Sequence, residues 1–418
     1  MQSPSKPGPG AVVLGLGGCL DYEIEWDATV LQALANYHGL GSVDLERGDV
    51  IRTERALVCS ILAFVRDGEG GERAVADHEV VEGYAVRHRR SVTLGGTSVR
   101  AGIVMSKIGV PSTLHLVSED EQVRSLLPTD VEYFCSASED SINPHLIVQF
   151  PRGARVVLAD IEVVAPESNR LIYVCDPPNR LMELAPELGD MLADADVFLI
   201  SGFNAMDARS LLDARMDTLR EDMRQLRDDA VVVYEDAGFH VPGFERVVID
   251  ALHDRIDVYS LNEDELQAHL GRRVSLLDPV DVVGALRRVR DLLAVPTLVV
   301  HTRYWTLAYG ARAHEMRAAI DGGVSMASAR YLHGDAMTQD DYSAVANIPR
   351  QPVGEGFATR IESLLGDLVR CVAARGLEAD SPTTVGLGDA FMGGMVAVIA
   401  GQATDRGADA AAPADARS

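Results

Sequence analysis

Lysine is almost absent from this chain of 418 residues, which contains only Lys6 and Lys107. Nearly all basic side chains are therefore arginine, a bias of composition or of salt adaptation that says nothing about catalysis. Asp and Glu number 63 against 38 Lys and Arg, so the formal net charge is −25. This charge argues against nucleic acid and anionic membranes as general partners. A helix N-terminus or a bound metal ion can still hold phosphate locally.

Paired cysteines and long apolar runs are missing too. The five cysteines are scattered and form no Cys-x-x-Cys motif, which argues against a disulfide framework or a zinc site and favours reduced thiols. No apolar stretch approaches the length of a membrane span. Residues 1–10 lack a signal core and predict a frayed lead-in, and residues 401–418 predict a disordered tail. We expect a cytoplasmic protein that is a monomer or a small homo-oligomer.

What the chain does have is a regular succession of short apolar runs. Its hydrophobic content of 47% is enough for one large domain and a smaller one. Several runs end in glycine or in a polar residue, which is typical of buried strands in a parallel sheet: 11–15, 197–204, 231–237, 258–262 and 296–302. The pattern predicts a doubly wound α/β sheet flanked by helices. Two further stretches predict β hairpins and one predicts a loop: 55–93, 142–157 and 335–352.

Residues 383–394 carry the pattern best suited to chemistry. A β-branched run leads into Gly386, Leu387, Gly388 and Asp389, and then into a small apolar segment that favours a helix. Glycines let backbone N–H groups approach a ligand, and a helix that begins at Asp389 would add its positive dipole end. Such a site can hold phosphate, with Asp389 as general base for an incoming hydroxyl. The alternative is an ordinary glycine turn with Asp389 as N-cap.

Polar residues follow other predicted strands, at the edge where α/β sheets bind ligands. Asp21 comes after the first strand, and Glu235 ends the strand 231–237. Asn262 and Glu265 are three residues apart and share a face of a helical turn. Together with Glu235, they offer the amide and carboxylate groups that suit Mg²⁺. Each acid could instead cap a helix or face solvent.

A glycine pair precedes the helix that is predicted to run toward Gly109. Gly96 would let a ligand approach the backbone, and Thr97 could hydrogen-bond a hydroxyl group. Arg100, in the same helix, could meet a negative group on a substrate, although a solvated arginine is the commoner outcome.

Taken in order, these motifs resemble the ADP-dependent glucokinase and phosphofructokinase family of the ribokinase-like superfamily, from about Gly15 to Ile399. The resemblance implies a Mg²⁺-dependent kinase that phosphorylates a sugar-like hydroxyl with ADP as donor. It places the base and its anion hole at Asp389, Gly386, Leu387 and Gly388, the metal at Glu235, Asn262 and Glu265, the acceptor at Asp21, Gly96 and Thr97, and the nucleotide at His301, Thr302 and Asn204.

The chain also departs from the family. Gly17 and Cys19 stand where the family has asparagines before its acidic residue, and Thr97 replaces a residue that is often Gln, Asn or Lys. We therefore do not expect glucose to be the best acceptor, and a nucleoside-like acceptor stays open. An ATP-dependent sugar or nucleoside kinase of the same fold and a non-catalytic binding homologue are the alternatives. His301 is as compatible with a structural role as with a functional one.

The same resemblance divides the chain into a nucleotide-binding domain and a smaller β-rich lid. The large domain is expected to comprise residues 1–20, 94–135 and 185–400. The lid is expected to comprise residues 21–93 and 136–184. A lid suits phosphoryl transfer because water left in the site would hydrolyse the donor.

Overall fold

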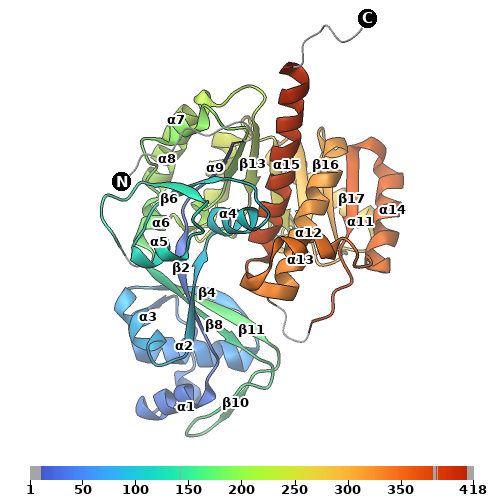
Figure 1. The fold of residues 1–418 in the computed structure, drawn as a ribbon. Coiled ribbons are helices and arrows are strands. Elements are labelled where there is room, and N and C mark those ends of the chain that lie inside the picture. The colour runs from blue at the N-terminus through green and yellow to red at the C-terminus, as the bar shows by residue number, and fades with distance from the viewer. Residues whose placement is uncertain (1–10, 142, 380–382, 384, 412–418) are drawn as a thin grey trace, which may run out of the picture.

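The computed structural model describes residues 11–141, 143–379, 383 and 385–411. Our predictions for residues 1–10 and for the end of the tail, residues 412–418, lie outside these ranges. The described chain forms two lobes, which Figure 1 shows one above the other. No helix in the described ranges is both long and apolar enough to cross a membrane.

The larger lobe is built on a nine-stranded sheet. Its seven strands from β15 to β7 are parallel, and β16 and β17 extend the sheet as antiparallel strands. In spatial order the strands are β17 (Val369–Ala373), β16 (Trp305–Gly310), β15 (Thr297–His301), β14 (Val258–Asn262), β13 (Val231–Glu235), β12 (Val197–Ile200), β1 (Val12–Leu14), β6 (Thr113–Leu116) and β7 (Glu132–Cys135).

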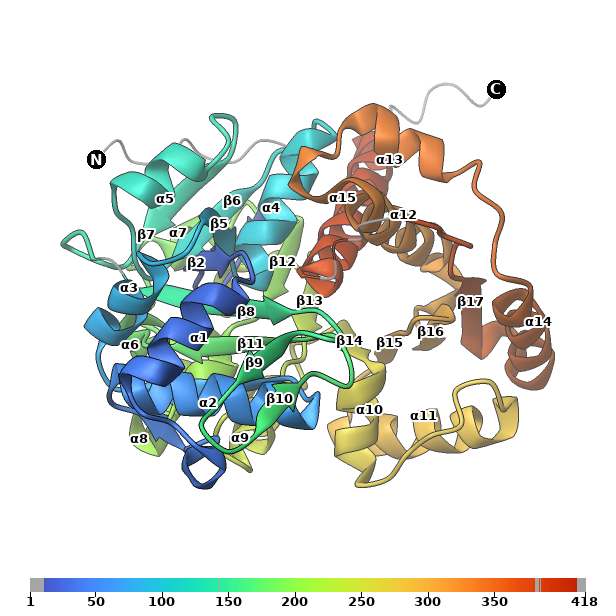
Figure 2. The same ribbon diagram turned by 90° about the horizontal axis from the view of Figure 1, so that it is seen from below.

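Both faces of this sheet are covered by helices, because both faces are apolar. Val12 and Leu14 pack into one hydrophobic cluster, whereas Val13, between them, packs into the other. Figure 2 shows α12 and α15 on one side of the strands and α10, α11 and α14 on the other. The first face carries α4 (Thr97–Lys107), α12 (Arg317–His333) and α15 (Leu387–Ala411); the second carries α7 (Leu188–Leu192), α8 (Arg209–Asp222), α9 (Phe244–Leu252), α10 (Glu263–Leu270), α11 (Pro279–Leu293) and α14 (Pro352–Leu365). The predicted doubly wound sheet is confirmed.

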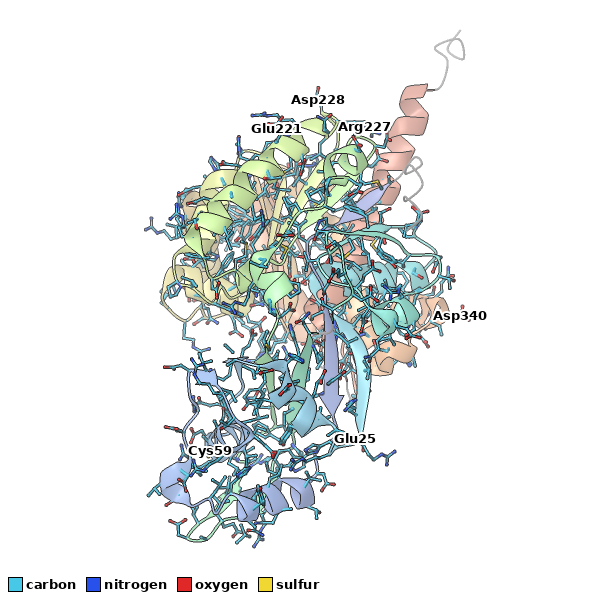
Figure 3. The ribbon with its side chains drawn as sticks, turned by 90° about the vertical axis from the view of Figure 1, so that its left-hand side faces the viewer. Glu25, Cys59, Glu221, Arg227, Asp228 and Asp340 are labelled. Carbon is cyan, nitrogen blue, oxygen red and sulfur yellow. The ribbon has the colours of Figure 1, made fainter. Side chains whose placement is uncertain are left out.

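The smaller lobe contains a six-stranded mixed sheet. Figure 3 places Glu25 and Cys59 in this lobe, and Glu221 and Arg227 at the far end of the larger one. In spatial order its strands are β3 (Val50–Ile51), β4 (Gly71–Val75), β11 (Asn169–Val174), β8 (Pro144–Phe150), β2 (Cys19–Ile24) and β5 (Arg90–Gly95). The lobe also holds α1 (Ala28–Tyr37), α2 (Glu54–Asp67), α3 (His78–Ala85) and the hairpin β9–β10 (Arg155–Val157, Glu162–Val164). Three shorter helices complete the described chain: α5 (Glu121–Leu126), α6 (Pro177–Leu181) and α13 (Gln339–Val345).

Both predicted hairpins are wrong. The run within 55–93 that was predicted as a strand is α2, which is buried without interruption from Leu57 to Val65, so that this apolar run resembles a buried strand. Thr53 caps its start and Gly68, at φ 68°, ends it. In the second stretch, β8 pairs with β2 and β11, while β9 pairs with β10.

Two expectations near the C-terminus also need correction. The predicted loop 335–352 contains α13, which begins with a capping box between Thr338 and Asp341. The predicted tail begins too early, because α15 continues through this Ala-rich segment to Ala411.

Candidate active site

A cavity of about 310 Å³ lies between the carboxyl edge of the nine-stranded sheet and one face of the six-stranded sheet. The larger lobe contributes loops and helix starts, and the smaller lobe contributes side chains of β2, β4, β8 and β11. Seven of the predicted site residues line it: Asp21, Gly96, Thr97, Asn204, Glu235, Gly386 and Asp389. Six do not: Leu387, Gly388, Asn262, Glu265, His301 and Thr302.

Two helix N-termini meet at this cavity. α4 begins at Thr97, and α15 begins at Leu387, two residues before the predicted start at Asp389. The helices can approach closely because Gly393 has no side chain: a Cβ there would lie 2.4 Å from Val104 Cγ2. Thr97 Oγ1 donates a 3.0 Å hydrogen bond to Asp389 Oδ1. The free N–H groups of both helix starts therefore lie beside the same carboxylate.

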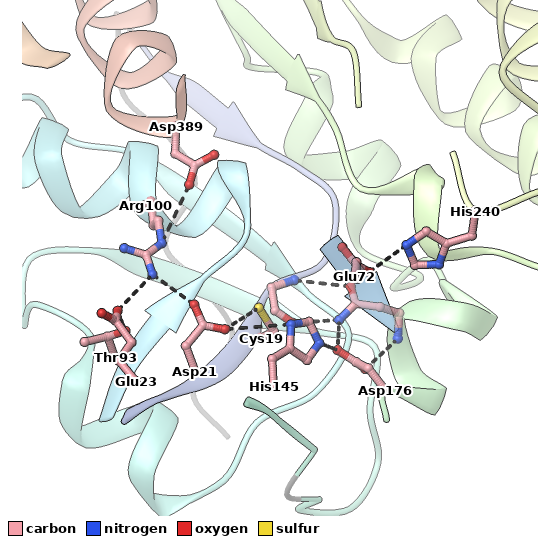
Figure 4. Close-up of polar contacts among 12 residues, drawn as sticks. Cys19, Asp21, Glu23, Glu72, Thr93, Arg100, His145, Asp176, His240 and Asp389 are labelled. Carbon is pink, nitrogen blue, oxygen red and sulfur yellow. Dashed lines mark hydrogen bonds and ion pairs between the residues drawn. The ribbon is translucent and has the colours of Figure 1, made fainter. Parts of the chain in front are cut away.

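Arg100 is buried at the centre of this arrangement, so the solvated alternative is wrong. Its Nη2 lies 2.9 Å from Asp21 Oδ2 and 3.6 Å from Glu23 Oε1. Its Nε lies 3.6 Å from Asp389 Oδ2 (Figure 4). Burial alone would lower the pKa of Arg100, but Asp21 and Asp389 together raise it above its usual value. The guanidinium thus stays charged and links Asp21, the predicted acceptor ligand, to the predicted base.

The loop before α15 is fixed by two arginines. Gly386 has φ 69°, and a Cβ there would lie 2.9 Å from Arg100 Cδ and 3.1 Å from Arg330 Nε. Arg330 Nε donates to the carbonyl of Val385 at 2.8 Å, and its Nη1 donates to Asp335 Oδ1 at 2.6 Å. Glycine is required at residue 386 both for its conformation and for this close packing.

Asp21 does not lie where the first strand ends. That strand stops at Leu14, and Asp21 lies within β2 of the other sheet, where its carboxylate is buried and still reaches the cavity. The prediction of its place in the fold is therefore wrong, although the residue does line the cavity.

A cluster of acids lies at the end of β13. Burial raises the pKa of Glu235 well above its usual range, and the charges of Asp389 and Asp236 add to the shift. Burial raises the pKa of Glu265, and the negative charges of Glu235 and Asp236 at the end of β13 add to the shift, to about 8. His301 Nε2 is 3.6 Å from Glu235 Oε1, but burial lowers the pKa of His301. The cluster is thus short of positive charge, and no described group donates a hydrogen bond to Glu235 Oε2.

The Asn-x-x-Glu motif forms a helix cap. Asn262 Oδ1 accepts hydrogen bonds from the N–H groups of Asp264 and Glu265 at 2.8 and 3.0 Å. Glu265 Oε2 accepts one from the N–H of Asn262 at 2.8 Å. This capping box starts α10 and turns Glu265 toward the acid cluster.

Of the three residues predicted to bind the nucleotide, only Asn204 lines the cavity. His301 stacks on Phe391 of α15, with ring centroids 4.7 Å apart. Thr302 is occupied in the β15–β16 turn, where its hydroxyl donates to the carbonyl of Trp305 at 2.8 Å and accepts from the N–H of Tyr304 at 3.2 Å.

The chain shares its sequence pattern with a known family. A family model described as the ADP-specific phosphofructokinase/glucokinase conserved region matches residues 10–398. The chain belongs to this family. The resemblance found in the motifs is thereby confirmed.

Individual relatives are distant in sequence. An ADP-specific phosphofructokinase of Thermococcus litoralis is 23% identical over 295 residues, which cover 62% of this chain and 63% of the relative. The match thus spans less than two thirds of that protein.

Solved structures show that the fold is shared along almost the whole chain. A hypothetical ADP-dependent phosphofructokinase from Pyrococcus horikoshii OT3 superposes with a TM-score of 0.76 at 18% identity, covering 94% of this chain and 99% of that one. An ADP-dependent kinase in complex with fructose-6-phosphate and ADPβS gives a TM-score of 0.71 at 13% identity, covering 94% of each chain.

This member of the phosphofructokinase/glucokinase family has polar groups near Asp21 in the cavity that the sequence motifs did not reveal. His145 Nε2 lies 2.9 Å from Asp176 Oδ2. Asn179 Nδ2 donates to Asp176 Oδ2 at 2.7 Å and to the carbonyl of Gly18 at 2.8 Å. Asp176 lies two residues after the end of β11 and caps α6, so its place after a strand and before a proline pair was the available signal. Nothing local marks His145.

A second ion pair joins the lobes at the cavity, besides the one between Arg100 of α4 and Asp21 of β2. His240, in the segment after β13, places Nε2 2.7 Å from Oε1 of Glu72 on β4. Its hydrogen bond with Glu72 raises the pKa of His240. Burial opposes the ionised form of Glu72, but the same hydrogen bond holds its pKa below the usual value.

Proposed function

We propose that the protein is a kinase that transfers the terminal phosphoryl group of ADP to a hydroxyl of a sugar or sugar-like acceptor and leaves AMP. The observation that carries the proposal is the convergence of the α4 and α15 N-termini on one cavity, with Asp389 between them. The family assignment and the phosphofructokinases named above support ADP as donor.

In this proposal Asp389 takes the proton of the attacking hydroxyl. Its Oδ1 is oriented by Thr97 and its Oδ2 faces Arg100, so the carboxylate is fixed before the acceptor binds. The backbone N–H groups at the start of α15, which reaches the cavity at Gly386, stabilise the negative charge of the transferring group. The six-stranded sheet acts as the lid, and its closure over the cavity excludes water.

The acid cluster fits a divalent cation such as Mg²⁺. Glu235 would hold it through Oε2, which lacks a donor, while Glu265 and Asn262 would orient its hydration shell. A bound cation would neutralise charge on the donor phosphates. Burial and then neighbouring acids raise the pKa values of Glu235 and Glu265, and a bound cation would oppose both effects by stabilising the ionised carboxylates.

We place the acceptor against Asp21. The carboxylate lines the cavity and is fixed by Arg100, whose own charge is already matched by Asp21, Glu23 and Asp389. The structure thus gives no support to an acceptor whose negative group binds Arg100. Gly17 and Cys19 remove two amides that the family uses on sugar hydroxyls. Each lost neutral hydrogen bond weakens binding by about 0.5–1.5 kcal/mol, so glucose should be a weak acceptor.

The test is a steady-state comparison of ADP and ATP as donors across glucose, fructose 6-phosphate, ribose derivatives and nucleosides. We expect AMP to form from ADP together with a phosphorylated acceptor, and glucose not to give the highest kcat/KM. Turnover with ATP alone would replace the ADP-dependent proposal with an ATP-dependent kinase of the same fold. Nucleotide binding without transfer to any acceptor would identify a non-catalytic homologue. Cytoplasmic location and a monomeric or small oligomeric state belong to the proposal as well.

A further inference from the structure

A second cluster of metal-binding side chains lies in the same cavity, on the other lobe. Cys19 and Asp21 are two residues apart on β2, so their side chains share a face of the sheet. His145 of β8 is the register partner of Asp21 in the parallel pairing of these strands. Sheet geometry therefore places a thiol, a carboxylate and an imidazole side by side. Counting cysteines cannot reveal this set, because it contains only one.

Two of the distances between the three groups match those of a small tetrahedral site. The ligand atoms of Cys19, Asp21 and His145 all lie within 4.8 Å of one another. Cys19 Sγ is 3.4 Å from Asp21 Oδ1, and His145 Nδ1 is 3.7 Å from the same oxygen. Zinc bonds of ~2.0–2.3 Å at tetrahedral angles separate neighbouring ligand atoms by roughly 3.3–3.8 Å.

The histidine is already oriented as a metal ligand. Its Nε2 is hydrogen-bonded to Asp176, and its other ring nitrogen, Nδ1, points toward Cys19 and Asp21 (Figure 4). A carboxylate behind a ligating histidine fixes its tautomer and raises its basicity. Asp176 is itself held by the side chain and backbone N–H of Asn179. The backing carboxylate is 2% exposed, so its hydrogen bonds are shielded from water.

We propose that Cys19, Asp21 and His145 bind a thiophilic divalent cation such as Zn²⁺, with the fourth coordination position open to the cavity. All three residues line that cavity, so water or a ligand can take the fourth position. Asp21 binds through Oδ1, because Oδ2 is engaged by Arg100. This site is distinct from the acid cluster near Glu235, whose oxygen ligands suit a hard cation.

Binding of the cation exchanges one bond for another without redox chemistry. A metal–sulfur bond forms, and the thiol proton of Cys19 leaves to solvent. Since Asp21 is also our acceptor ligand, the bound cation should compete with the acceptor, a consequence that rests on the proposed function.

Co²⁺ added to the full-length reduced protein tests the site by absorption spectroscopy, without any activity measurement. We expect a thiolate-to-cobalt charge-transfer band that Zn²⁺ displaces. Cys19→Ser should abolish it, and His145→Gln should weaken Co²⁺ binding. Asp176→Asn should weaken it by about 10- to 100-fold. Cys135→Ser is the control, since Cys135 is likewise partly buried but lies on β7 and outside the cavity.

Two results would overturn the site: no charge-transfer band with the wild-type protein, or a band of full intensity in Cys19→Ser. The wild-type spectrum decides the question even if a variant fails to fold. Inhibition by Zn²⁺ should be competitive with the acceptor and lost in Cys19→Ser. A protein that shows the band but no kinase activity keeps the metal site and loses the proposed function. An active kinase that shows no charge-transfer band keeps the proposed function and loses the metal site.

Discussion

The two sheets contribute to the cavity in different ways. The nine-stranded sheet offers strand ends and helix starts, where residues close in sequence line the cavity, as Gly386 and Asp389 do. The six-stranded sheet offers a face, where Cys19 and Asp21 of β2 lie beside His145 of β8. A cluster at a strand end is therefore visible in a short stretch of sequence. A cluster on a sheet face exists only once the strands have paired.

The largest expected effect lies on the strand-end side. Asp389→Asn keeps the hydrogen bond from Thr97 and the packing of α15, but it removes the proton acceptor. We expect kcat to fall by roughly 10²-fold or more, with nucleotide affinity nearly unchanged. Steady-state kinetics and calorimetric titration of the nucleotide would measure the two quantities.

The matched control for this substitution is Asp367→Asn, whose side chain is 98% exposed and remote from the cavity. It should leave kcat unchanged. A folded Asp389→Asn variant with near wild-type turnover would show that Asp389 is not the base. The contrast between the two sheets would then no longer rest on catalysis at the strand ends.

The two lobes also differ in how much of their structure could be predicted from the sequence. The strands that carry Glu235, Asn262 and His301 were predicted, because each is a buried apolar run that ends in a polar residue. The smaller lobe was predicted poorly. Helix α2 is buried without interruption from Leu57 to Val65, so this run resembles a buried strand, and only Thr53 and Gly68 mark the ends of the helix. The partners of β8 are distant in sequence, so no local pattern could place His145 beside Asp21.

The next effect concerns the acid cluster. Glu235→Gln keeps the shape of the side chain but removes a carboxylate that lacks a donor. We expect the Mg²⁺ concentration for half-maximal activity to rise by about 10- to 100-fold, and Glu265→Gln should act in the same direction. Asp264→Asn, on the exposed side of the same helix turn, is the control. Unchanged Mg²⁺ dependence in both Gln variants would place the metal elsewhere.

Packing in the larger lobe gives a moderate effect on stability. A Cβ at Gly394 would lie 2.5 Å from the carbonyl oxygen of Gly322 on α12. Gly394→Ala should therefore lower the free energy of unfolding by about 1–3 kcal/mol. At Gly401, on the same helix, a Cβ would have no atom within 4 Å, so Gly401→Ala should instead stabilise by roughly 0.5–1 kcal/mol. Chemical denaturation would measure both, and equal effects would mean that α15 is not tightly packed.

The smallest effect is expected where the lobes meet, at the pair formed by His240 and Glu72. Their side chains are 37% and 40% exposed, so solvent screens the attraction. The pair should therefore change acceptor KM by at most about fivefold. His145 opposes the charge on His240, and Asp207 supports it. Because the bonded His240 has a raised pKa, its contribution is complete below the ordinary value of 6.5 and is lost as pH rises through the raised value.

Glu72 sets the other limit of this pH dependence. Its pKa is lowered, so its contribution is present above the ordinary value of 4.5 and is lost as pH falls through the lowered value. Acceptor KM in the wild type should thus be lowest between about 4.5 and 6.5 and should rise above that window. His240→Gln should flatten this rise, whereas His253→Gln, whose Nδ1 lies 3.2 Å from the carbonyl oxygen of Ile249, should not. A profile that His240→Gln leaves unchanged would show that closure of the two lobes does not depend on this contact.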